Sequence, residues 1–492
     1  MITQLDIENF RSIKSASIKF NKINAVIGPN NAGKSNILRA IDLLLGDKYV
    51  TEGSFQDSDF YKHNKENTIR MRIRFDEPLQ SNRNVYGFSL DFDGNECIYS
   101  PINMAGEVID YGYGPSRVKN EMKDEVRLML LGVNRLASQQ IKTSQWELYG
   151  RLLKKIERTI DNVKKEQFEK DIERSYNANI YPQVQEFEEL LKQHTKELTG
   201  LNLDLHLSIL DPLWTIKGLR PYLKELEDEV ENDVEGVGAG VQSMLAVSIA
   251  NAYSKIVKKS VILAIEEPEL YLHPHGCRVF YSILKKLADN VQVIYTTHDS
   301  YFVNIENYKD IILTRKYRGQ TMLTLGSEMN LDAKYETKML SKFDEERNEI
   351  FFADTVILVE GYGDKIACSM ALEKLGIDLD RNNISIIEGT GAGDIPTLAS
   401  VLVGFQIEAI ALIDDDKPRE IEELKAIVKD TDAVMIQGPG ALEGMWHLDN
   451  KPKRDNAIGI FTKWLNEHEQ SEIPDIYKKL SMKLTKGKST TT

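Results

Sequence analysis

A glycine-rich run that ends in lysine and serine occupies residues 28–35, in the order Gly-Pro-Asn-Asn-Ala-Gly-Lys-Ser. Gly28 and Gly33 supply backbone freedom, so that successive amide groups can face phosphate oxygens. Lys34 is expected to reach the terminal phosphates of a nucleotide, and Ser35 to bind the accompanying magnesium ion. This spacing of residue types predicts a site for ATP and Mg²⁺.

A second run, residues 261–265, is apolar and leads directly into Glu266 and Glu267. Short apolar runs of this kind are typical of buried strands, and ligands gather where such strands end. Glu266 is expected to orient the magnesium shell, and Glu267 to polarise the water that attacks the terminal phosphate. The pair therefore indicates an ATPase.

Further carboxylates follow two more strand-like runs, residues 355–359 and 410–413. Glu360 ends the first run, and Asp414 and Asp416 follow the second at a spacing that places both side chains on one side of an extended backbone. Carboxylates packed that closely disfavour joint ionisation unless a cation compensates. Hard oxygen ligands favour Mg²⁺ or Mn²⁺, and a two-ion site would suit cleavage of a phosphodiester.

The elements that must position these groups can be placed from hydrophobic periodicity. Residues 1–45 predict strand, turn, strand, loop and helix, which is the context that a phosphate loop requires. Residues 148–198 show helical spacing in two runs and predict an inserted hairpin, and residues 201–325 return to α/β character. Residues 332–349 predict a helix and linker, and residues 486–492 a frayed polar tail.

The function of the inserted hairpin stays open between three interpretations. Its lysines are typical of a solvated face, but they would also suit contact with DNA or with a partner. We favour dimerisation, because the two apolar stripes of the hairpin need a surface to cover them.

Composition excludes several classes of protein. The 492 residues exceed what one hydrophobic core usually organises, and the 41% hydrophobic and 28% charged content argues against extensive disorder. A net charge of −14 argues against a wholly basic nucleic-acid binder, although a local basic groove remains compatible with it. No signal peptide or membrane-spanning run is expected, and three scattered cysteines favour a reducing cytoplasm.

Two further motifs follow the order found in ABC-type ATPases. Residues 238–243 precede a helix-like run and resemble the signature loop, and His298 follows a strand and resembles the switch histidine. In ABC ATPases the signature of one subunit completes the phosphate site of another. The resemblance therefore implies at least a dimer, in which Ser243 would touch the terminal phosphate bound by a second subunit.

The second set of carboxylates resembles a Toprim domain, in which Glu360 and Asp364 precede the Asp414 and Asp416 pair by about fifty residues. Behind an ABC-type ATPase, this arrangement is similar to the OLD (overcoming lysogenisation defect) family of ATP-dependent endonucleases. The resemblance implies that these four carboxylates bind metal, with Glu443 as the further acid expected downstream. The lysine that the family carries after that acid has no clear counterpart.

The sequence thus predicts an α/β chain, an ABC-type ATPase with an inserted helical hairpin followed by a Toprim (Rossmann-like) domain. The expected boundaries are 1–140 and 201–335 for the ATPase, 141–200 for the insertion, 351–455 for Toprim and 456–492 for a helical extension with a polar tail. The expected nucleotide-binding residues are Gly28, Asn30, Asn31, Gly33, Lys34, Ser35, Ser243, Glu266 and His298. The expected metal ligands are Ser35, Glu266, Glu360, Asp364, Asp414, Asp416 and Glu443, and the expected catalytic residues are Glu267, Glu360, Asp414 and Asp416.

Three functions of different class are consistent with these motifs. The favoured one is an ATP-regulated, metal-dependent DNA endonuclease, for which the resemblance implies a role in defence against phage and a helicase-like or other effector partner. The second is an ATPase scaffold whose Toprim domain binds a partner without cutting DNA. A topoisomerase or primase is a distant third, because no tyrosine-bearing cleavage domain or zinc motif accompanies the carboxylates.

Overall fold

The computed structural model describes residues 1–110, 116–133, 148–199, 219, 221–224, 231–257, 260–303, 305–339, 347–438, 441–448 and 452–486. The expected polar tail therefore lies outside the described residues, except for Lys486. The chain divides into two compact units, Met1–Leu130 with Ser260–Thr492, and Leu131–Lys259. No helix among the described residues is both long enough and apolar enough to cross a bilayer.

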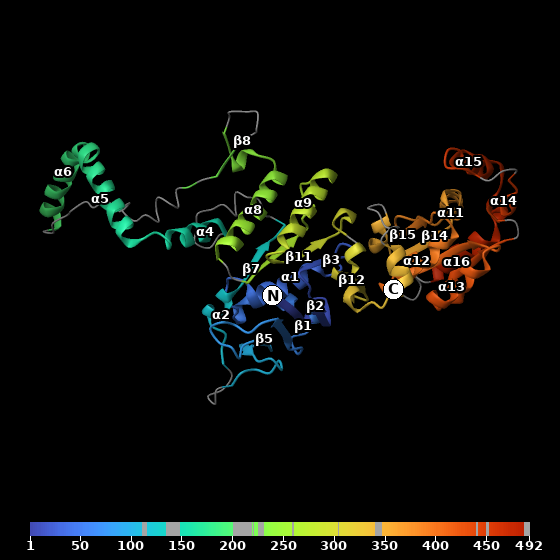
Figure 1. Cartoon of the computed structure of the whole chain (residues 1–492), viewed down its shortest axis with the longest axis horizontal. Helices are drawn as coiled ribbons and strands as arrows, with labels where there is room; N and C mark the ends of the chain where they lie inside the picture. Colours follow the sequence, from blue (N-terminus) through green and yellow to red (C-terminus); the bar gives the residue numbers. More distant parts are fainter. Residues whose placement is uncertain are drawn as a thin grey trace. The chain divides into compact units, whose positions relative to one another are not determined.

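The first unit begins with an antiparallel sheet of five strands (Figure 1). In sheet order the strands are β2 (Ile13–Lys19), β1 (Ile2–Phe10), β4 (Ile69–Phe75), β5 (Gly87–Phe92) and β6 (Cys97–Ile102). Along β4, buried and more exposed residues alternate, as expected for a sheet with one face on the core.

A second, mixed sheet carries the segments predicted to bind nucleotide. In sheet order its six strands are β13 (Gln320–Leu325), β12 (Ile311–Tyr317), β3 (Ile23–Ile27), β11 (Gln292–Thr297), β10 (Ser260–Glu266) and β7 (Val126–Leu131). The neighbours β12, β3, β11 and β10 run parallel to one another, so their carboxyl ends lie at the same edge of the sheet.

Helix α1 (Lys34–Leu45) packs between these two sheets. Its residues Ile37, Ile41 and Leu44 are fully buried in one hydrophobic core with residues of both sheets. Over residues 1–45 the predicted strands, loop and helix are present, with three strands (β1, β2 and β3) before the loop where the predicted order had two. Helices α2 (Asn120–Glu125), α9 (Pro274–Leu287) and α10 (Ala333–Met339) complete the part of this region that the structure describes.

The remainder of the first unit holds a parallel four-stranded sheet, drawn in orange and red in Figure 1. In sheet order its strands are β15 (Ile384–Glu388), β14 (Thr355–Val359), β16 (Glu408–Asp414) and β17 (Val434–Gln437). Helices α12 (Ile395–Gly404) and α13 (Pro418–Val428) pack on one another and against the sheet. Helix α11 (Tyr362–Lys374) packs against β14 and β15, and α14 (Ala441–Met445), α15 (Ala457–Glu467) and α16 (Asp475–Lys486) complete the group.

The C-terminal helices belong to the core of this parallel sheet. Trp446, Phe461 and Tyr477 are fully buried in a hydrophobic cluster with apolar residues of β14, β16 and α11. The indole Nε1 of Trp446 donates a hydrogen bond of 3.5 Å to the hydroxyl of Tyr477. Residues Phe461 and Tyr477, from the segment that we expected to be a helical extension, thus pack into the core of the preceding sheet.

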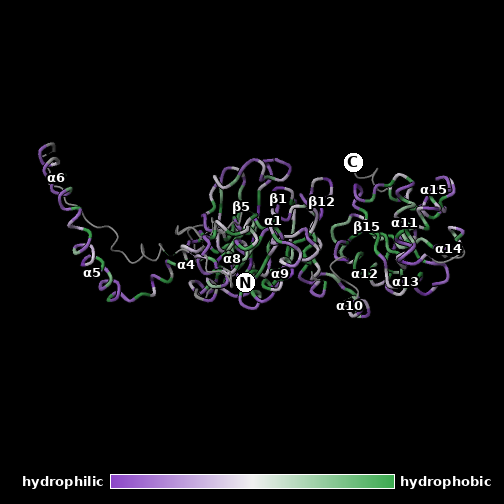
Figure 2. The backbone as a smooth tube through the Cα atoms, turned by 90° about the horizontal axis from the view of Figure 1, so that it is seen from above, coloured by the Kyte–Doolittle hydropathy of each residue, from purple (hydrophilic) through white to green (hydrophobic). Residues whose placement is uncertain are grey.

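The second unit is mainly helical over the residues that the structure describes. Its elements are α4 (Leu148–Glu157), α5 (Asn162–Asn179), α6 (Tyr181–Thr199), β8 (Tyr222–Lys224), β9 (Glu231–Asp233) and α8 (Ala239–Val257). Helices α5 and α6 contact one another, so the predicted hairpin is present. Figure 2 shows both helices mostly in the purple and white of polar residues, and no described residue of α5 is buried. Their apolar residues Val163, Phe187 and Leu190 are exposed.

Candidate functional site

The phosphate loop lies between β3 and α1, where the sequence predicted it. Gly28 has a φ of 144° and Gly33 a φ of 106°, and Asn31 between them has a φ of 63°. A Cβ added at Gly28 would lie 2.1 Å from the backbone oxygen of Thr314. Both the backbone angle and the close approach of β12 therefore require glycine at this position.

The tip of the loop is fixed by a short chain of hydroxyl groups. The Oγ1 of Thr321 donates to the carbonyl oxygen of Ala32 at 2.9 Å and lies 2.7 Å from the Oγ of Ser12. The side-chain amide of Asn36 donates to the same Ser12 oxygen at 2.8 Å. The turn between β1 and β2 thus supports the loop from outside, a contribution that the local motif did not reveal.

Lys34 is buried within the loop that it belongs to. Its Nζ donates to the carbonyl oxygens of Gly28 and Pro29 at 2.8 and 3.1 Å. Burial lowers the pKa of the Lys34 ammonium, while the nearby carboxylates Glu267, Glu269 and Glu266 raise it. These three acids are therefore close enough to influence the charge of the lysine. Ser35, the next residue, is exposed, as are Asn30 and Asn31.

The acidic pair follows β10, two strands away from the strand that precedes the phosphate loop. Glu266 is the last residue of β10, and Glu267 has a φ of 49°, a left-handed conformation that is uncommon for a residue with a side chain. The backbone N–H of Glu267 donates to the carbonyl oxygen of Thr296 at 2.9 Å. Pairing with β11 therefore sustains the unusual conformation of Glu267.

His298 follows β11, the strand between the other two. Its Nδ1 lies 3.6 Å from an oxygen of Glu267 and 3.2 Å from an oxygen of Glu269. Three neighbouring parallel strands thus end in the phosphate loop, the acidic pair and the histidine, at the edge of a sheet where ligands usually bind. This arrangement brings together Lys34, Glu266, Glu267 and His298, while Glu269 was not expected from the sequence.

The signature-like segment lies in the second unit, at the start of α8. Gly238 and Val241 are exposed, whereas Ser243 is fully buried and its hydroxyl has no hydrogen-bond partner. The helix begins at Ala239, so Ser243 lies on the same helical face as the buried Ala246 and Val247. We expected the Ser243 hydroxyl to contact a phosphate. In this structure it lies instead on the buried face of α8.

The second set of carboxylates lies at the carboxyl edge of the parallel four-stranded sheet. Glu360 directly follows β14, and Asp414 is the last residue of the neighbouring β16. The backbone N–H of Asp414 donates to the Oε1 of Glu360 at 2.8 Å. The predicted meeting of these two residues at one sheet edge therefore occurs.

The other predicted ligands lie on three separate segments. Asp364 is buried in the first turn of α11, and Asp416 is exposed and pairs with Lys417 at 2.7 Å. Glu443 is half-buried in α14. Within the described ranges, no group of three His, Cys, Asp or Glu side chains is arranged to hold a metal ion.

The chemistry of the donor set nevertheless suits a hard divalent cation, since every predicted ligand here is a carboxylate. A further acid, Glu388, ends β15 and is the register partner of Val359, the residue before Glu360. Its Oε2 is buried without a hydrogen-bond partner, which is costly for a carboxylate oxygen unless a cation or another group uses it. We therefore add Glu388 to the candidate site.

Two cations accompany these acids. The ammonium of Lys417 contacts both oxygens of Asp416, and this hydrogen bond raises the pKa of the lysine, with Asp416, Glu360 and Asp414 adding to the effect. The guanidinium of Arg454 lies over the ring of Tyr362, and its Nη2 is 4.0 Å from Glu388. Two lysines follow Glu443 in the sequence: Lys453 is exposed, and Lys451 lies outside the described residues.

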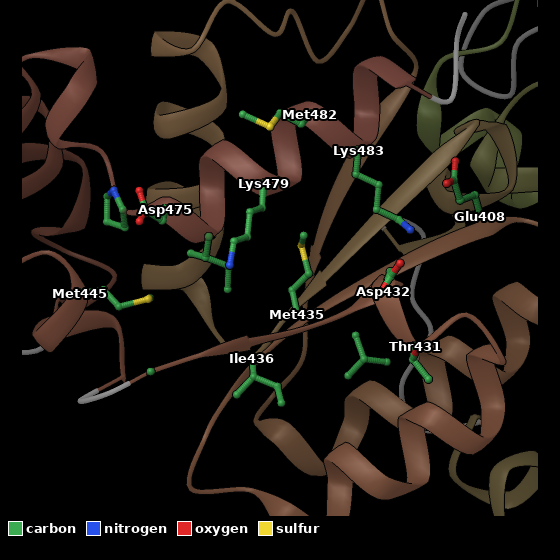
Figure 3. Close-up of a pocket in the computed structure, with 14 residues that line it drawn as sticks. Glu408, Thr431, Asp432, Met435, Ile436, Met445, Asp475, Lys479, Met482 and Lys483 are labelled. Carbon is green, nitrogen blue, oxygen red and sulfur yellow. The ribbon is translucent and has the colours of Figure 1, made fainter. Parts of the chain in front are cut away.

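A groove of about 1050 Å³ lies elsewhere on the same sheet, along the edge strand β17 and the helix α16 (Figure 3). Methionines from three segments, Met435, Met445 and Met482, line it together with Lys479. None of its lining residues is one of the candidate metal ligands. The groove is thus a separate feature of this region.

Comparison with protein families identifies two matching models. The model described as "AAA ATPase domain" matches residues 1–130 and 128–303. The model described as "Overcoming lysogenization defect protein-like, TOPRIM domain" matches residues 351–416. The first match includes the phosphate loop, the acidic pair and His298. The second includes Glu360, Asp364, Asp414 and Asp416.

Three curated proteins resemble most of the chain. The "OLD nuclease" of Thermus scotoductus is 29% identical over 437 residues, which cover 85% of this chain and 82% of that protein. The "Old nuclease" of Escherichia phage P2 is 22% identical over 84% of this chain and 77% of its own length. The "Endonuclease GajA" of Bacillus cereus is 23% identical over 79% and 70%, respectively.

Among solved structures, a head domain of an SMC protein bound to the C-terminal winged-helix domain of ScpA is similar to part of the chain. It has a TM-score of 0.43 and 17% sequence identity, and the match covers 66% of this chain and 97% of that one.

Proposed function

We propose that this chain, which belongs to the OLD family of ATPases with a Toprim domain, is an ATP-regulated, divalent-metal-dependent DNA endonuclease that acts in defence against phage. The observation that carries the proposal is the hydrogen bond between the Asp414 amide and Glu360, which brings acids from two adjacent strands to one point. Because the nucleotide site occupies a different sheet, hydrolysis and cleavage would use separate residues.

In the nucleotide half, the loop amides and Lys34 would bind the phosphates of ATP, while Ser35 and Glu266 would hold Mg²⁺. Glu267 would orient the attacking water, and His298 would contact the terminal phosphate. The segment 238–243 of a second copy would complete the site, since its exposed start at Gly238 is available to a partner. A homodimer or higher oligomer follows, and we assign the hairpin of α5 and α6 to its interface because its apolar residues are exposed.

In the Toprim half, Glu360, Asp364, Asp414, Asp416 and Glu443 would hold Mg²⁺ or Mn²⁺. When bound, such ions stabilise the attacking and leaving oxygens of phosphodiester cleavage. Glu360 and Asp414 would form the centre of the ligand set, and Lys417, which contacts Asp416, would restrain the Asp416 side chain. The ammonium of Lys417 and the guanidinium of Arg454 would attract the DNA phosphates to an otherwise acidic edge.

We further propose a cytoplasmic location and an effector protein, helicase-like or other, as a partner. The location is supported by Cys97, Cys277 and Cys368, which are all free thiols.

One observation favours a second function, an ATPase scaffold whose Toprim domain binds a partner without cutting DNA. Within the described ranges the acids do not form a three-ligand group, and the metal-binding arrangement would therefore have to form during use. A scaffold has no requirement for that rearrangement.

The decisive experiment compares the wild type with a Glu360→Ala variant on supercoiled plasmid, with Mg²⁺ or Mn²⁺ and a series of ATP concentrations. We expect nicking or linearisation by the wild type and none by the variant, with equal ATP hydrolysis in both. Glu349→Ala, a change in a carboxylate outside the cluster, is the matched control and should cut like the wild type. Absence of cutting by the wild type under every condition, with ATP hydrolysis intact, would favour the scaffold.

A further inference from the structure

His298 lies between two carboxylates, only one of which the sequence had assigned to the nucleotide site. Its Nδ1 is 3.6 Å from Glu267 and 3.2 Å from the Oε1 of Glu269. An acid that faces one ring nitrogen of a histidine fixes the proton there and leaves the other nitrogen for a further group. Glu269 is therefore the nearer of the two groups that can orient the imidazole.

Glu269 also holds the backbone that carries the histidine. The same Oε1 accepts a hydrogen bond from the His298 N–H at 2.9 Å and another from the Thr297 hydroxyl at 2.8 Å. Thr297 is the last residue of β11, while Glu269 follows the end of β10 by three residues. One carboxylate oxygen thus links the loops that leave two neighbouring strands.

The environment of Glu269 is unfavourable for a residue with a purely structural role. The side chain is 6% exposed, and its Oε2 is buried without a hydrogen-bond partner. Burial raises the pKa of Glu269 above its usual value, although the hydrogen bonds from His298 and Thr297 oppose that effect. A buried carboxylate with an unsatisfied oxygen lowers the stability of the fold, and such groups concentrate at functional sites.

We propose that Glu269 is a positioning residue for ATP hydrolysis, which holds the His298 ring and its backbone in register with Glu267 and the phosphate loop. It acts through His298 and does not itself touch the nucleotide. The inference rests on the proposed ATPase function of the same site. It predicts that loss of the Glu269 carboxylate slows the chemical step and leaves the binding of ATP nearly unchanged.

The test is a double-mutant cycle in the full-length protein, with kcat for phosphate release and the dissociation constant for ATP measured separately. Glu269→Ala should lower kcat by roughly a hundredfold, as expected when a catalytic group is misplaced by about an ångström. The dissociation constant should change by less than about threefold, because uniform binding is retained. Combining Glu269→Ala with His298→Ala should give no greater loss than His298→Ala alone, since residues that act as a unit are not additive.

A second variant guards against misfolding of the alanine form. Glu269→Gln keeps an oxygen that can accept from the His298 N–H and the Thr297 hydroxyl, but it removes the charge that faces Nδ1. Because a hydrogen bond to a charged group is about twice as strong as a neutral one, kcat should fall by an intermediate factor, about tenfold. Asp299→Asn is the matched control: its side chain accepts the Tyr301 N–H, a bond that asparagine can also accept, so kcat should remain within about twofold.

Each result distinguishes the inference from the function on which it rests. Multiplicative losses in the double variant, or a loss of ATP affinity as large as the loss of kcat, would overturn the positioning role while leaving the ATPase in place. A wild-type protein that binds ATP without hydrolysing it would instead contradict the proposed ATPase itself.

Discussion

The nucleotide site and the carboxylate site both lie at the carboxyl edge of parallel strands, but they differ in how their side chains are held. In the nucleotide site, hydrogen bonds from outside the motif fix each part: Thr321 supports the loop, Thr296 holds the backbone of Glu267, and Glu269 holds His298. In the carboxylate site, the Asp414 amide donates a hydrogen bond to the Oε1 of Glu360 from the neighbouring strand end. Lys417 pairs with the exposed Asp416.

The difference follows from charge. The phosphate loop offers N–H groups and a lysine, and these can be satisfied by carbonyl and carboxylate groups of the protein itself. A cluster of acids repels itself, so it can close fully only around a cation. We infer that the nucleotide site is preorganised by the fold, whereas the metal site is completed by its ions.

The largest expected effect comes from a change that should impair the nucleotide site and leave the carboxylate site intact. Lys34→Ala removes the buried ammonium next to Glu266 and Glu267, and ATP hydrolysis should fall by at least about a hundredfold because transition-state charge loses its main cation. Stabilisation by Mg²⁺ at the Toprim half should persist. Phosphate release and thermal unfolding with and without MgCl₂ check both statements, with the exposed Lys14→Ala as control. Loss of the Mg²⁺ effect would contradict the separation.

The next effect concerns cations and the acidic edge. Asp414→Asn keeps the shape of the side chain but removes a charge beside Glu360, so the part of the stabilisation by Mg²⁺ that comes from this site should disappear. When the Mg²⁺ concentration is a hundred times the dissociation constant of the site, that stabilisation amounts to about 2.7 kcal/mol. Unfolding with EDTA or MgCl₂ measures it, preferably in the Lys34→Ala background so that the nucleotide site does not contribute. Asp432→Asn, an exposed aspartate near β17, should retain the full shift.

A smaller effect tests the external support of the phosphate loop. Thr321→Val keeps the volume of the side chain but removes the hydroxyl that links Ser12 to Ala32. We expect a loss of about 1 to 2 kcal/mol in unfolding free energy and a weaker affinity for ATP. Chemical denaturation and nucleotide titration provide the measurements. Thr324→Val, on the same strand, is the control, and an equal loss there would indicate a general weakening of β13.

The smallest effect has a pH dependence. Burial raises the pKa of Glu269, so the folded state binds a proton at this carboxyl more tightly than the unfolded chain does. The stability that comes from this proton is present below the usual pKa of about 4, and it is lost as pH rises through the raised pKa. Glu269→Gln has no such loss. Relative to the wild type, the variant should gain stability as pH rises from about 4 to neutrality while its kcat is lower. Unfolding curves of both proteins across that pH range measure this gain. A difference in unfolding free energy that does not change with pH would contradict the prediction.

The sequence anticipated those parts of the site that local patterns encode. The phosphate loop, the acids after β10 and the carboxylates after β14 and β16 were predicted because each follows a strand directly, and all four predicted strand ends are observed. A helical hairpin was predicted over residues 148–198 from helical spacing, and the structure has α5 and α6 there, separated at Ile180.

Residues whose role depends on contact between distant segments were missed. Glu269 carries no periodic signal, and its function follows only from the pairing of β10 with β11. Ser243 shows the converse, since the motif suggested an exposed hydroxyl while the start of α8 at Ala239 turns that side chain inward. Whether a motif residue precedes a helix or lies within it depends on where the helix begins. The boundaries of helices are the feature that a sequence predicts least well.

The amino-acid sequence by itself determined which chemical groups are present and that they follow strand ends, because a strand and the residue after it are contiguous and their pattern is local. The tertiary structure decided which strands are neighbours. That choice placed His298 between two acids, brought Glu388 beside the Glu360 strand, and packed Tyr477 into the core of the parallel sheet. Such contacts join residues far apart in the chain, and they are selected by the packing of the whole core rather than by any short segment.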